Sequence, residues 1–452
     1  MCDTHDLEKE LRPIRVLLIV DSLYWVIGNF AKQIQKENPG TEASIYSKFA
    51  IKKAVKRFGH FPNSFDVIHF LTFKPKRFFV GHLPTVTTFH HKNSKTKISP
   101  LHEMDGVMTV SQQWLHYLTK QGIPENYIRL VPFGVNTNEF YPAKYEEGLK
   151  IRKQLHIPKE TFLIGFAGKC SSDREGRKGL DCFTKSVTEL RTQVEKLSIL
   201  LIGPGWQNLA RTFKKQEISC TYLPYYFDHA QIAKFYRALD VFWVTSRIEG
   251  GPVTLLEAMA SGIPCISTPV GAALDLIDHG KNGFIVSFDS SELFVNLSLK
   301  LAQDPELRHR IGNAARNTIL RERQWSHVRM KLQELYSLAI RNYHAHLNPS
   351  SSQNETSDKW RKPNQNMSLQ KPMSEELFFS HRVQNWIKSC EEINGLQMML
   401  EMREWKFSIR FALRALSRAP FDPSLWREII SVLLKSRKSA PLQAMYDETQ
   451  TL

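Results

Sequence analysis

Two glutamates, Glu249 and Glu257, stand eight residues apart in a glycine- and proline-containing segment that runs from residue 246 to residue 264. Pro252 suits the first helical position, because its missing N–H costs nothing there and its φ is already helical. Gly262, followed by Pro264, suits the end of the same helix. The segment therefore predicts a glycine loop and a short helix, with Glu249 just before the helix and Glu257 inside it.

This loop and helix have the features of a site for a phosphorylated ligand. Gly250 and Gly251 let the backbone approach a ligand closely, and the free N–H groups at a helix start attract an anion. The two carboxylates could then hold hydroxyl-bearing groups on either side of a bound phosphate. Strand-like segments at residues 240–244 and 265–268 flank the loop and the helix, and a sheet is therefore expected to position them.

Short apolar runs alternate with helical or loop segments in two sets, which is the pattern of doubly wound α/β domains. The first set predicts strands at residues 14–20, 67–70, 85–89, 106–110 and 128–131. The second set predicts strands at residues 162–167, 197–203, 240–244, 265–268 and 283–286. Periodic apolar residues predict a helix from Trp325 to Asn342.

The segment from Ser246 to Pro264 resembles the signature of the retaining glycosyltransferases of family 4, which have the two-domain GT-B fold. The E-x7-E motif of that family falls on Glu249 and Glu257, and residues 264–271 and 278–286 match as well. The resemblance spans roughly residues 14–342. It implies an α/β fold with two doubly wound Rossmann-like domains facing a cleft, and this chain adds a small C-terminal helical extension.

The expected domain boundaries combine this resemblance with composition. Residues 1–142 form a Rossmann-like acceptor-side domain, residues 143–324 a Rossmann-like nucleotide-sugar-binding domain, and residues 325–344 a return helix that packs on the first domain. Residues 345–374 are rich in polar residues and lack apolar periodicity, which predicts a linker. Residues 375–452 form a helical extension of unassigned role, expected to place on one face Trp405, Ile409, Ala412, Leu413 and Leu416.

The resemblance implies that the segment around the two glutamates holds a nucleotide-diphosphate sugar. Glu249 would contact hydroxyls of the donor sugar as one of two catalytic residues, and Glu257 would contact the ribose hydroxyls. Backbone amides of the donor-binding loop would meet the sugar and the phosphate. The residues of that loop are Gly250, Gly251, Pro252, Val253 and Thr254.

A basic loop after the strand at residues 162–167 would bind the diphosphate and stabilise it as a leaving group. In the family, an arginine and a later Lys-Gly pair clamp this group. Lys178 matches the lysine, whereas Lys169 stands where arginine is usual and keeps the charge without the bidentate fork. Gly203 belongs to another loop at a strand end facing the cleft. A solvated basic loop and a plain turn are the alternative interpretations.

Two residues of the first domain complete the predicted site. His90 follows the strand at residues 85–89, and by resemblance it would reach the transferring sugar or position the acceptor as the second catalytic residue. A structural histidine at a loop start is the alternative. Gly28 is the single glycine that survives from the family's glycine-rich loop after the first strand, which by resemblance would contact the phosphate of the donor. This departure keeps open a catalytically weakened sugar-nucleotide binder.

Neither a metal ion nor another cofactor is expected. No Asp-x-Asp run is placed as a metal ligand, and the GT-B fold usually works without one. Lysine and helix-start amides would replace the cation. The resemblance implies front-face retaining transfer, in which the leaving phosphate itself helps to deprotonate the acceptor.

The net charge of +16 favours an anionic partner. Cations interleave with apolar residues from Lys48 to Phe58, as on an amphipathic helix, and cations mix with aromatics from Phe73 to Phe79. Such surfaces can lie on an anionic membrane, and a solvated charged face is the alternative.

A basic nucleic-acid-binding protein would explain the charge but not the two glutamates, and no recognised RNA or DNA module is present. Nucleic acid is therefore not an expected partner.

Six scattered cysteines, a polar N-terminus and the lack of a long apolar stretch favour a cytoplasmic protein. The basic segments add the expectation that it is peripheral at the membrane. The expected function is transfer of a hexose, with retention, from a nucleotide-sugar donor to a glycan or lipid-linked acceptor, such as one of lipopolysaccharide type.

Overall fold

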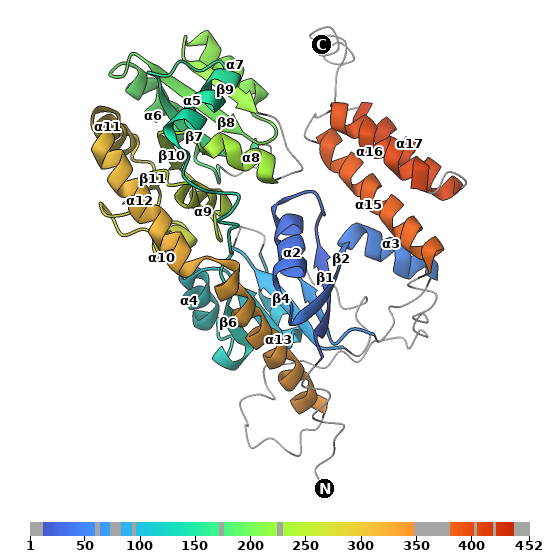
Figure 1. Cartoon of the computed structure of the whole chain (residues 1–452). Helices are drawn as coiled ribbons and strands as arrows, with labels where there is room; N and C mark the ends of the chain where they lie inside the picture. Colours follow the sequence, from blue (N-terminus) through green and yellow to red (C-terminus); the bar gives the residue numbers. More distant parts are fainter. Residues whose placement is uncertain are drawn as a thin grey trace. The chain divides into compact units, whose positions relative to one another are not determined.

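The computed structural model describes residues 12–58, 64–72, 83–92, 96–170, 176–223, 229–347, 380–401, 405–418 and 422–437. In these residues the chain forms two six-stranded parallel sheets with flanking helices (Figure 1). The α/β class predicted from the two sets of apolar runs is therefore confirmed.

The first sheet has the strand order β2-β1-β3-β4-β5-β6. From β1 the chain runs outward to β2 and then continues on the other side of β1 with β3, so the strand order reverses at β1. The last five residues of β1 are completely buried, as expected for a strand covered on both faces. The strands are β1 (Ile14–Val20), β2 (Thr41–Ser47), β3 (Val67–Phe70), β4 (Thr85–Phe89), β5 (Gly106–Thr109) and β6 (Ile128–Leu130).

The second sheet has the strand order β12-β11-β10-β7-β8-β9. Its order reverses between β7 and β10, and ligands of such sheets bind outside the carboxyl ends of the strands at this point. Its strands are β7 (Phe162–Ala167), β8 (Leu197–Ile202), β9 (Ser219–Leu223), β10 (Val241–Val244), β11 (Cys265–Ser267) and β12 (Phe284–Ile285).

Helices connect the strands and extend beyond them. Up to β7 they are α2 (Val26–Glu37), α3 (Lys48–Phe58), α4 (Gln112–Lys120) and α5 (Tyr145–Gln154). Around the second sheet lie α6 (Leu180–Arg191), α7 (Gln207–Lys215), α8 (His229–Tyr236), α9 (Val253–Ala260), α10 (Ala272–Leu276), α11 (Ser291–Gln303) and α12 (Pro305–Glu322). The later helices are α13 (Trp325–Leu347), α15 (His381–Glu401), α16 (Trp405–Arg418) and α17 (Pro423–Arg437).

Contacts divide the chain into two compact units, one with residues 1–86 and 362–452 and the other with residues 87–361. The helical extension thus shares a unit with the first strands. Helix α13 belongs to the other unit and packs on β5 and β6. There Asn342 donates a hydrogen bond of 2.9 Å to the carbonyl of Asp105. The domain boundaries expected from the sequence stay a prediction.

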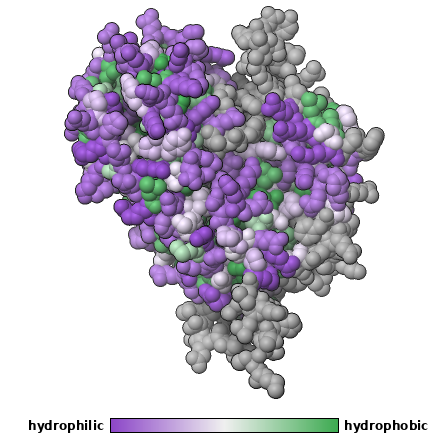
Figure 2. All heavy atoms as spheres, in the orientation of Figure 1, coloured by the Kyte–Doolittle hydropathy of each residue, from purple (hydrophilic) through white to green (hydrophobic). Residues whose placement is uncertain are grey.

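Aromatic residues fill the core of the second sheet. The rings of Phe166 and Phe183 lie 4.2 Å apart, and Trp206, Phe213 and Trp243 are almost completely buried beside them. Burial of such side chains is the main driving force for folding. On the face shown in Figure 2, hydrophilic residues dominate and hydrophobic ones form small separate patches.

The helical extension covers the helix that the basic pattern from Lys48 to Phe58 predicts. Helix α15 packs on α3, and both are drawn beside α16 and α17 in Figure 1. Lys53 and Arg57 of α3 form ion pairs of 2.8 and 3.0 Å with Glu428 and Asp422. Part of the apolar side of α3 is covered: Ala50, Ile51 and Ala54 are almost completely buried, whereas Phe49 and Val55 are partly exposed.

Two further points bear on the expected membrane contact. The aromatic and basic run from Phe73 to Phe79 lies outside the described residues. Across the described ranges, no helix has the length and apolar character needed to span a bilayer.

The side of α16 that packs is not the apolar face expected from the sequence. Among its described side chains Ser408, Phe411 and Ala415 are buried, whereas Leu413 is 63% exposed. Leu413 therefore lies away from the packed side of the helix. Residues three and four apart align on one side of a helix, and Leu413 lies two residues from both Phe411 and Ala415, on another side.

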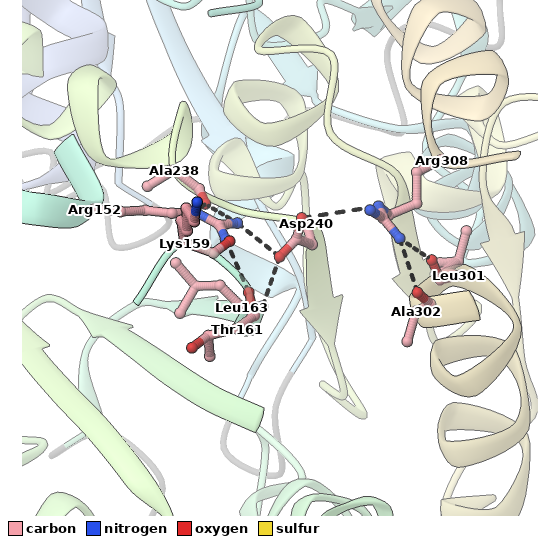
Figure 3. Close-up of polar contacts among 9 residues, drawn as sticks. All are labelled: Arg152, Lys159, Thr161, Leu163, Ala238, Asp240, Leu301, Ala302 and Arg308. Carbon is pink, nitrogen blue, oxygen red and sulfur yellow. Dashed lines mark hydrogen bonds and ion pairs between the residues drawn. The ribbon is translucent and has the colours of Figure 1, made fainter. Parts of the chain in front are cut away.

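A partly buried carboxylate, that of Asp240, joins the amino ends of the two central strands of the second sheet. Figure 3 shows Asp240, just before β10, between Arg152 and Arg308. Arg152 contacts Asp240 at 2.7 Å, and the amide of Leu163 in β7 donates to the same carboxylate oxygen at 2.7 Å. Arg152 also donates to three backbone carbonyls, those of Lys159, Thr161 and Ala238.

We expect Asp240→Asn to lower the free energy of unfolding by about 3 kcal/mol or more, because Arg152 would keep a buried charge without its carboxylate. Denaturant unfolding followed by circular dichroism measures this change. Asp278→Asn is the matched control, since Asp278 is exposed and its pairing with Lys281 contributes little. Equal stability of the two variants would contradict this role of Asp240.

Candidate functional site

Residues 176–179, which precede α6, lie against the carboxyl end of β10. Gly179 has a φ of +62°, and a Cβ added there would come 2.1 Å from the carbonyl oxygen of Thr245. In return, the Thr245 hydroxyl donates to the carbonyl of Lys178 at 2.8 Å. A glycine is therefore required for this close approach, which fixes the backbone of Lys178 at the point where the strand order reverses.

Arg247, which follows β10, forms further hydrogen bonds with the same segment. Its backbone amide donates to the carbonyl of Arg177 at 2.7 Å, and its guanidinium donates to the carbonyl of Gly176 at 2.8 Å. The guanidinium also forms ion pairs with Asp181 and Asp289. The loop that carries Lys178 is therefore fixed on both sides.

An ion pair between Lys178 and Glu249 forms the centre of the site. The Lys178 Nζ lies 2.6 Å from the Glu249 Oε1, and both side chains are nearly buried, with exposures of 13% and 12%. The Ser246 hydroxyl donates to the same carboxylate oxygen at 3.0 Å, and the indole of Trp114 donates to the Glu249 carbonyl at 2.8 Å. The structure thus brings together two of the residues predicted from separate motifs.

The pKa of Glu249 lies below its ordinary value. Burial raises the pKa of this carboxyl, but the nearby positive charges of Lys178 and Arg177 outweigh that effect. Glu249 is therefore a carboxylate at neutral pH. A carboxylate beside a lysine can accept hydrogen bonds from ligand hydroxyls while the lysine binds a phosphate oxygen.

His90 lies against the glycines that follow Glu249. Its ring stacks on Phe133 with a centroid distance of 5.7 Å. A Cβ added to Gly250 would come 2.3 Å from the His90 carbonyl oxygen, and one added to Gly251 would come 2.8 Å from the Phe133 ring. Both glycines are thus needed for close packing against the segment after β4. His90 and the glycine loop are therefore neighbours, and the catalytic role expected of His90 stays a prediction.

Two residues that the sequence analysis missed lie next to this centre. Arg177 Nη1 lies 2.6 Å from His91 Nε2. Burial, followed by the charge of Arg177, lowers the pKa of His91 to about 4, so the imidazole is neutral and can accept from the guanidinium. Each residue adjoins a predicted one in the chain, but their pairing joins segments 86 residues apart and has no local signature.

The short helix after the glycine loop is confirmed as α9. It starts at Val253, so Pro252 immediately precedes it instead of occupying its first position, and the Pro252 carbonyl accepts from Leu255 and Leu256. Gly262 follows the helix with a φ of +71°. The amides of Gly251, Val253 and Thr254 donate no hydrogen bond to any described residue. Such a helix start can bind an anion.

Glu257 has surroundings different from those of Glu249. It is only 4% exposed, and the Tyr236 hydroxyl donates to its carboxyl at 2.6 Å. Burial raises the pKa of Glu257 to about 8, and the charge of Glu139 contributes, while the Tyr236 hydrogen bond acts in the opposite direction. Glu257 is therefore mostly protonated at neutral pH. The E-x7-E motif alone does not predict this difference between the protonation states of its two glutamates.

The remaining predicted residues lie in two places. Gly203 has a φ of +113°, and a Cβ there would come 2.3 Å from the Gly168 carbonyl oxygen, so the loops after β7 and β8 are in contact. Lys169 follows Gly168 and is half-buried. Gly28 belongs to the other compact unit, where a Cβ would come 2.3 Å from the Ser22 carbonyl oxygen. Gly28 thus packs against its own loop.

In the described part of the chain, no three or more His, Cys, Asp or Glu side chains gather as a metal site would require. The expectation that no metal is needed stays a prediction.

Comparison with known proteins identifies a related family over part of the chain. Residues 149–318 match the family model of glycosyl transferases group 1. Over 198 residues the chain is 28% identical to D-inositol 3-phosphate glycosyltransferase of Corynebacterium jeikeium, covering 42% of this chain and 46% of that protein. Over 229 residues it is 27% identical to the lipopolysaccharide core biosynthesis mannosyltransferase LpsB of Rhizobium meliloti, covering 49% and 61%.

The curated relatives share only part of their length with this chain. It spans about half the length of those it matches. Their names therefore describe proteins to which it is similar.

Solved structures share the fold. A glycosyltransferase from Rickettsia africae ESF-5 has a TM-score of 0.60 at 16% identity and covers 73% of this chain and 99% of that one. Anabaena Alr3699/HepE, solved in complex with UDP and glucose, has a TM-score of 0.57 at 16% identity and covers 71% and 99%. These likenesses show the GT-B type of two-domain α/β fold. Together with the family match, they support a glycosyltransferase.

We predict that Glu257 makes stability fall as the pH rises. Its pKa of about 8 in the folded chain exceeds its ordinary value of 4.5, so the folded state binds the extra proton between these values. The free energy of unfolding should therefore decrease from about pH 5 to pH 8, by roughly 2–4 kcal/mol from this group. Glu257→Gln should remove this decrease in denaturant midpoints.

Glu195→Gln is the control for this experiment, because Glu195 is exposed in the loop before β8. It should keep the wild-type pH dependence. If Glu257→Gln also kept it, Glu257 would be ionised in the folded chain at neutral pH.

Proposed function

We propose that this chain is a retaining glycosyltransferase that moves a sugar from a nucleotide-diphosphate donor to a glycan or lipid-linked acceptor. The observation that carries the proposal is the Lys178–Glu249 pair at the carboxyl ends of β7 and β10, next to the start of α9. It combines a cation, a carboxylate and free helix-start amides at the position where a doubly wound sheet binds ligands.

The donor would use each part of this site. The diphosphate lies at the start of α9 within reach of Lys178, and Arg177 and Lys169 add positive charge beside it. Glu249, kept ionised by Lys178, accepts hydrogen bonds from sugar hydroxyls. Glu257 meets the ribose hydroxyls. That Anabaena Alr3699/HepE was solved with UDP-glucose supports a nucleotide-sugar donor for this fold.

The transfer step follows from these contacts. The bond between the anomeric carbon and the phosphate oxygen breaks, and its electron pair goes to the phosphate, which Lys178 and the α9 amides stabilise. The acceptor oxygen bonds to the anomeric carbon on the same face, and its proton passes to the departing phosphate. His90 positions the acceptor or donates to the sugar. No metal takes part.

Relatives suggest the kind of acceptor. The chain is similar to proteins named as a lipopolysaccharide core mannosyltransferase and as a phosphatidylinositol monomannoside mannosyltransferase. The mannosyl groups in these names support a hexose donor. The net charge of +16 supports the further proposal that the acceptor is held at an anionic membrane surface, on the cytoplasmic side.

We expect one of UDP-glucose, GDP-mannose and ADP-glucose to raise the melting temperature of the wild-type chain. Lys178→Met should weaken binding of that sugar nucleotide at least about ten-fold, because a hydrogen bond to a charged group contributes about 1.5–3 kcal/mol. Lys178→Arg, which keeps the charge beside Glu249, should bind more tightly than Lys178→Met. Isothermal titration measures these affinities.

Lys281→Met is the control, since Lys281 is an exposed lysine that pairs only with Asp278 in the described part of the chain. It should bind the donor like the wild type. Failure of all three donors to stabilise the wild-type chain would contradict the donor site, and unchanged affinity in Lys178→Met would remove Lys178 from it.

The stereochemistry of the product tests the retaining step. With the stabilising α-linked donor and methyl α-mannoside as acceptor, proton NMR should show a new α-linkage. A β-linked product would require inversion, and hence a base on the opposite face of the sugar.

A further inference from the structure

The loop after β1 occupies the reversal point of the first sheet. It spans residues 21–25, between the end of β1 and the start of α2. Because β2 and β3 flank β1 on opposite sides, a ligand of this sheet is expected outside the carboxyl end of β1. Asp21, the first residue of this loop, is exposed there. One oxygen of its carboxylate accepts a hydrogen bond of 2.8 Å from the Ser22 amide, and a carboxylate has further acceptor positions for the hydroxyls of a ligand.

The helical extension grips this loop at two points. The Asn394 side chain, on α15, donates to the Asp21 carbonyl at 3.1 Å. The ring of Tyr24 meets the ring of Phe411, on α16, edge to face at a centroid distance of 4.6 Å. A backbone hydrogen bond and an aromatic contact therefore hold both halves of the loop.

A glycine on α15 makes the aromatic contact possible. A Cβ added to Gly395 would come 2.6 Å from Phe411 and 2.9 Å from Tyr24, so both rings pack directly on the backbone of α15. Arg418 of α16 forms an ion pair with the buried Glu392 of α15. This ion pair thus links α15 and α16, the two helices on which the Tyr24 ring packs.

The extension is anchored independently of the loop. The amide of Ser47, at the end of β2, donates to the Glu391 carboxylate at 2.6 Å, and the Tyr46 hydroxyl donates to Gln384 at 3.0 Å. Lys53, on α3, forms an ion pair with Glu428, on α17. Helix α15 therefore packs on β2 and α3 through contacts that do not involve the loop, and it can restrict the motion of the loop.

Contacts within residues 21–28 also fix the conformation of the loop. Gly28 lies under the carbonyl of Ser22, which a Cβ would approach to 2.3 Å. The Tyr24 amide donates to the Ser22 hydroxyl at 3.2 Å. Gly28 lets the loop fold onto the first turn of α2, and the extension then covers the side chain of Tyr24.

We infer that the pair of helices α15 and α16 is a positioning element for the acceptor site of the first sheet. Asn394 and Phe411 are positioning residues that hold residues 21–25, so that the Asp21 carboxylate can bind hydroxyls of a polyhydroxylated acceptor. The choice of the acceptor as ligand rests on the proposed function. The extension thus belongs to the substrate-binding machinery of the chain.

Hydrogen exchange on the full chain tests the positioning. In Asn394→Ala and in Phe411→Leu, peptides covering residues 21–28 should exchange about ten-fold faster, because local opening becomes easier. Peptides of α15 should stay as protected as in the wild type. Glu428→Gln is the control: it removes the Lys53 pair without touching the loop and should leave residues 21–28 unchanged.

Turnover tests the ligand. With the stabilising sugar nucleotide and methyl α-mannoside as acceptor probe, both positioning variants should raise the KM for the mannoside about ten-fold, with donor affinity unchanged. Asp21→Asn should do the same without faster exchange. Unchanged exchange at residues 21–28 would overturn the inference, and so would an equal loss of donor affinity. A wild-type chain that binds no sugar nucleotide would instead contradict the proposed function, while the exchange result still judges the positioning.

Discussion

The ion pair between Lys178 and Glu249 is the constraint on which the candidate site depends. Each charge stabilises the other at such low exposure, because an isolated charge is costly to bury. Its formation requires that Gly179 press the lysine loop against β10 and that Gly250 and Gly251 press the glutamate loop against the segment after β4. The glycines are therefore as necessary to the site as the charged residues.

The strands show which features a single sequence can predict. The bounds of β1, β3, β4 and β7 agree with the predicted strands. Strands β1 and β7 are buried on both faces and are almost continuously hydrophobic, whereas β4 is recognised by its β-branched threonines and valine. Strands β2 and β9 were not predicted, because they are edge strands with partly exposed, mixed sequences. Their pairing depends on the neighbouring strand more than on local pattern.

The site was predicted as far as local motifs reach. Glu249, Lys178 and the glycines have spacings that can be read from the chain, and the structure brings them together with His90. The pair of Arg177 and His91 joins segments far apart in the sequence, and the donation from Trp114 to the Glu249 carbonyl does the same. A single sequence contains no signal for such pairings, because they are decided by the packing of complete elements.

The two glutamates of the motif show why spacing alone cannot assign chemistry. Glu249 is ionised because two cations outweigh its burial, whereas Glu257 is mostly neutral because burial dominates and its near partner is a tyrosine. An ionised carboxylate can only accept hydrogen bonds, while a protonated one can also donate. Glu257 would ionise only if a bound nucleotide donated hydrogen bonds that replace the solvation lost by burial. Without such donors, its protonated carboxyl would itself donate to the ligand. The state of Glu257 would thus depend on the ligand, whereas that of Glu249 is set by the protein itself.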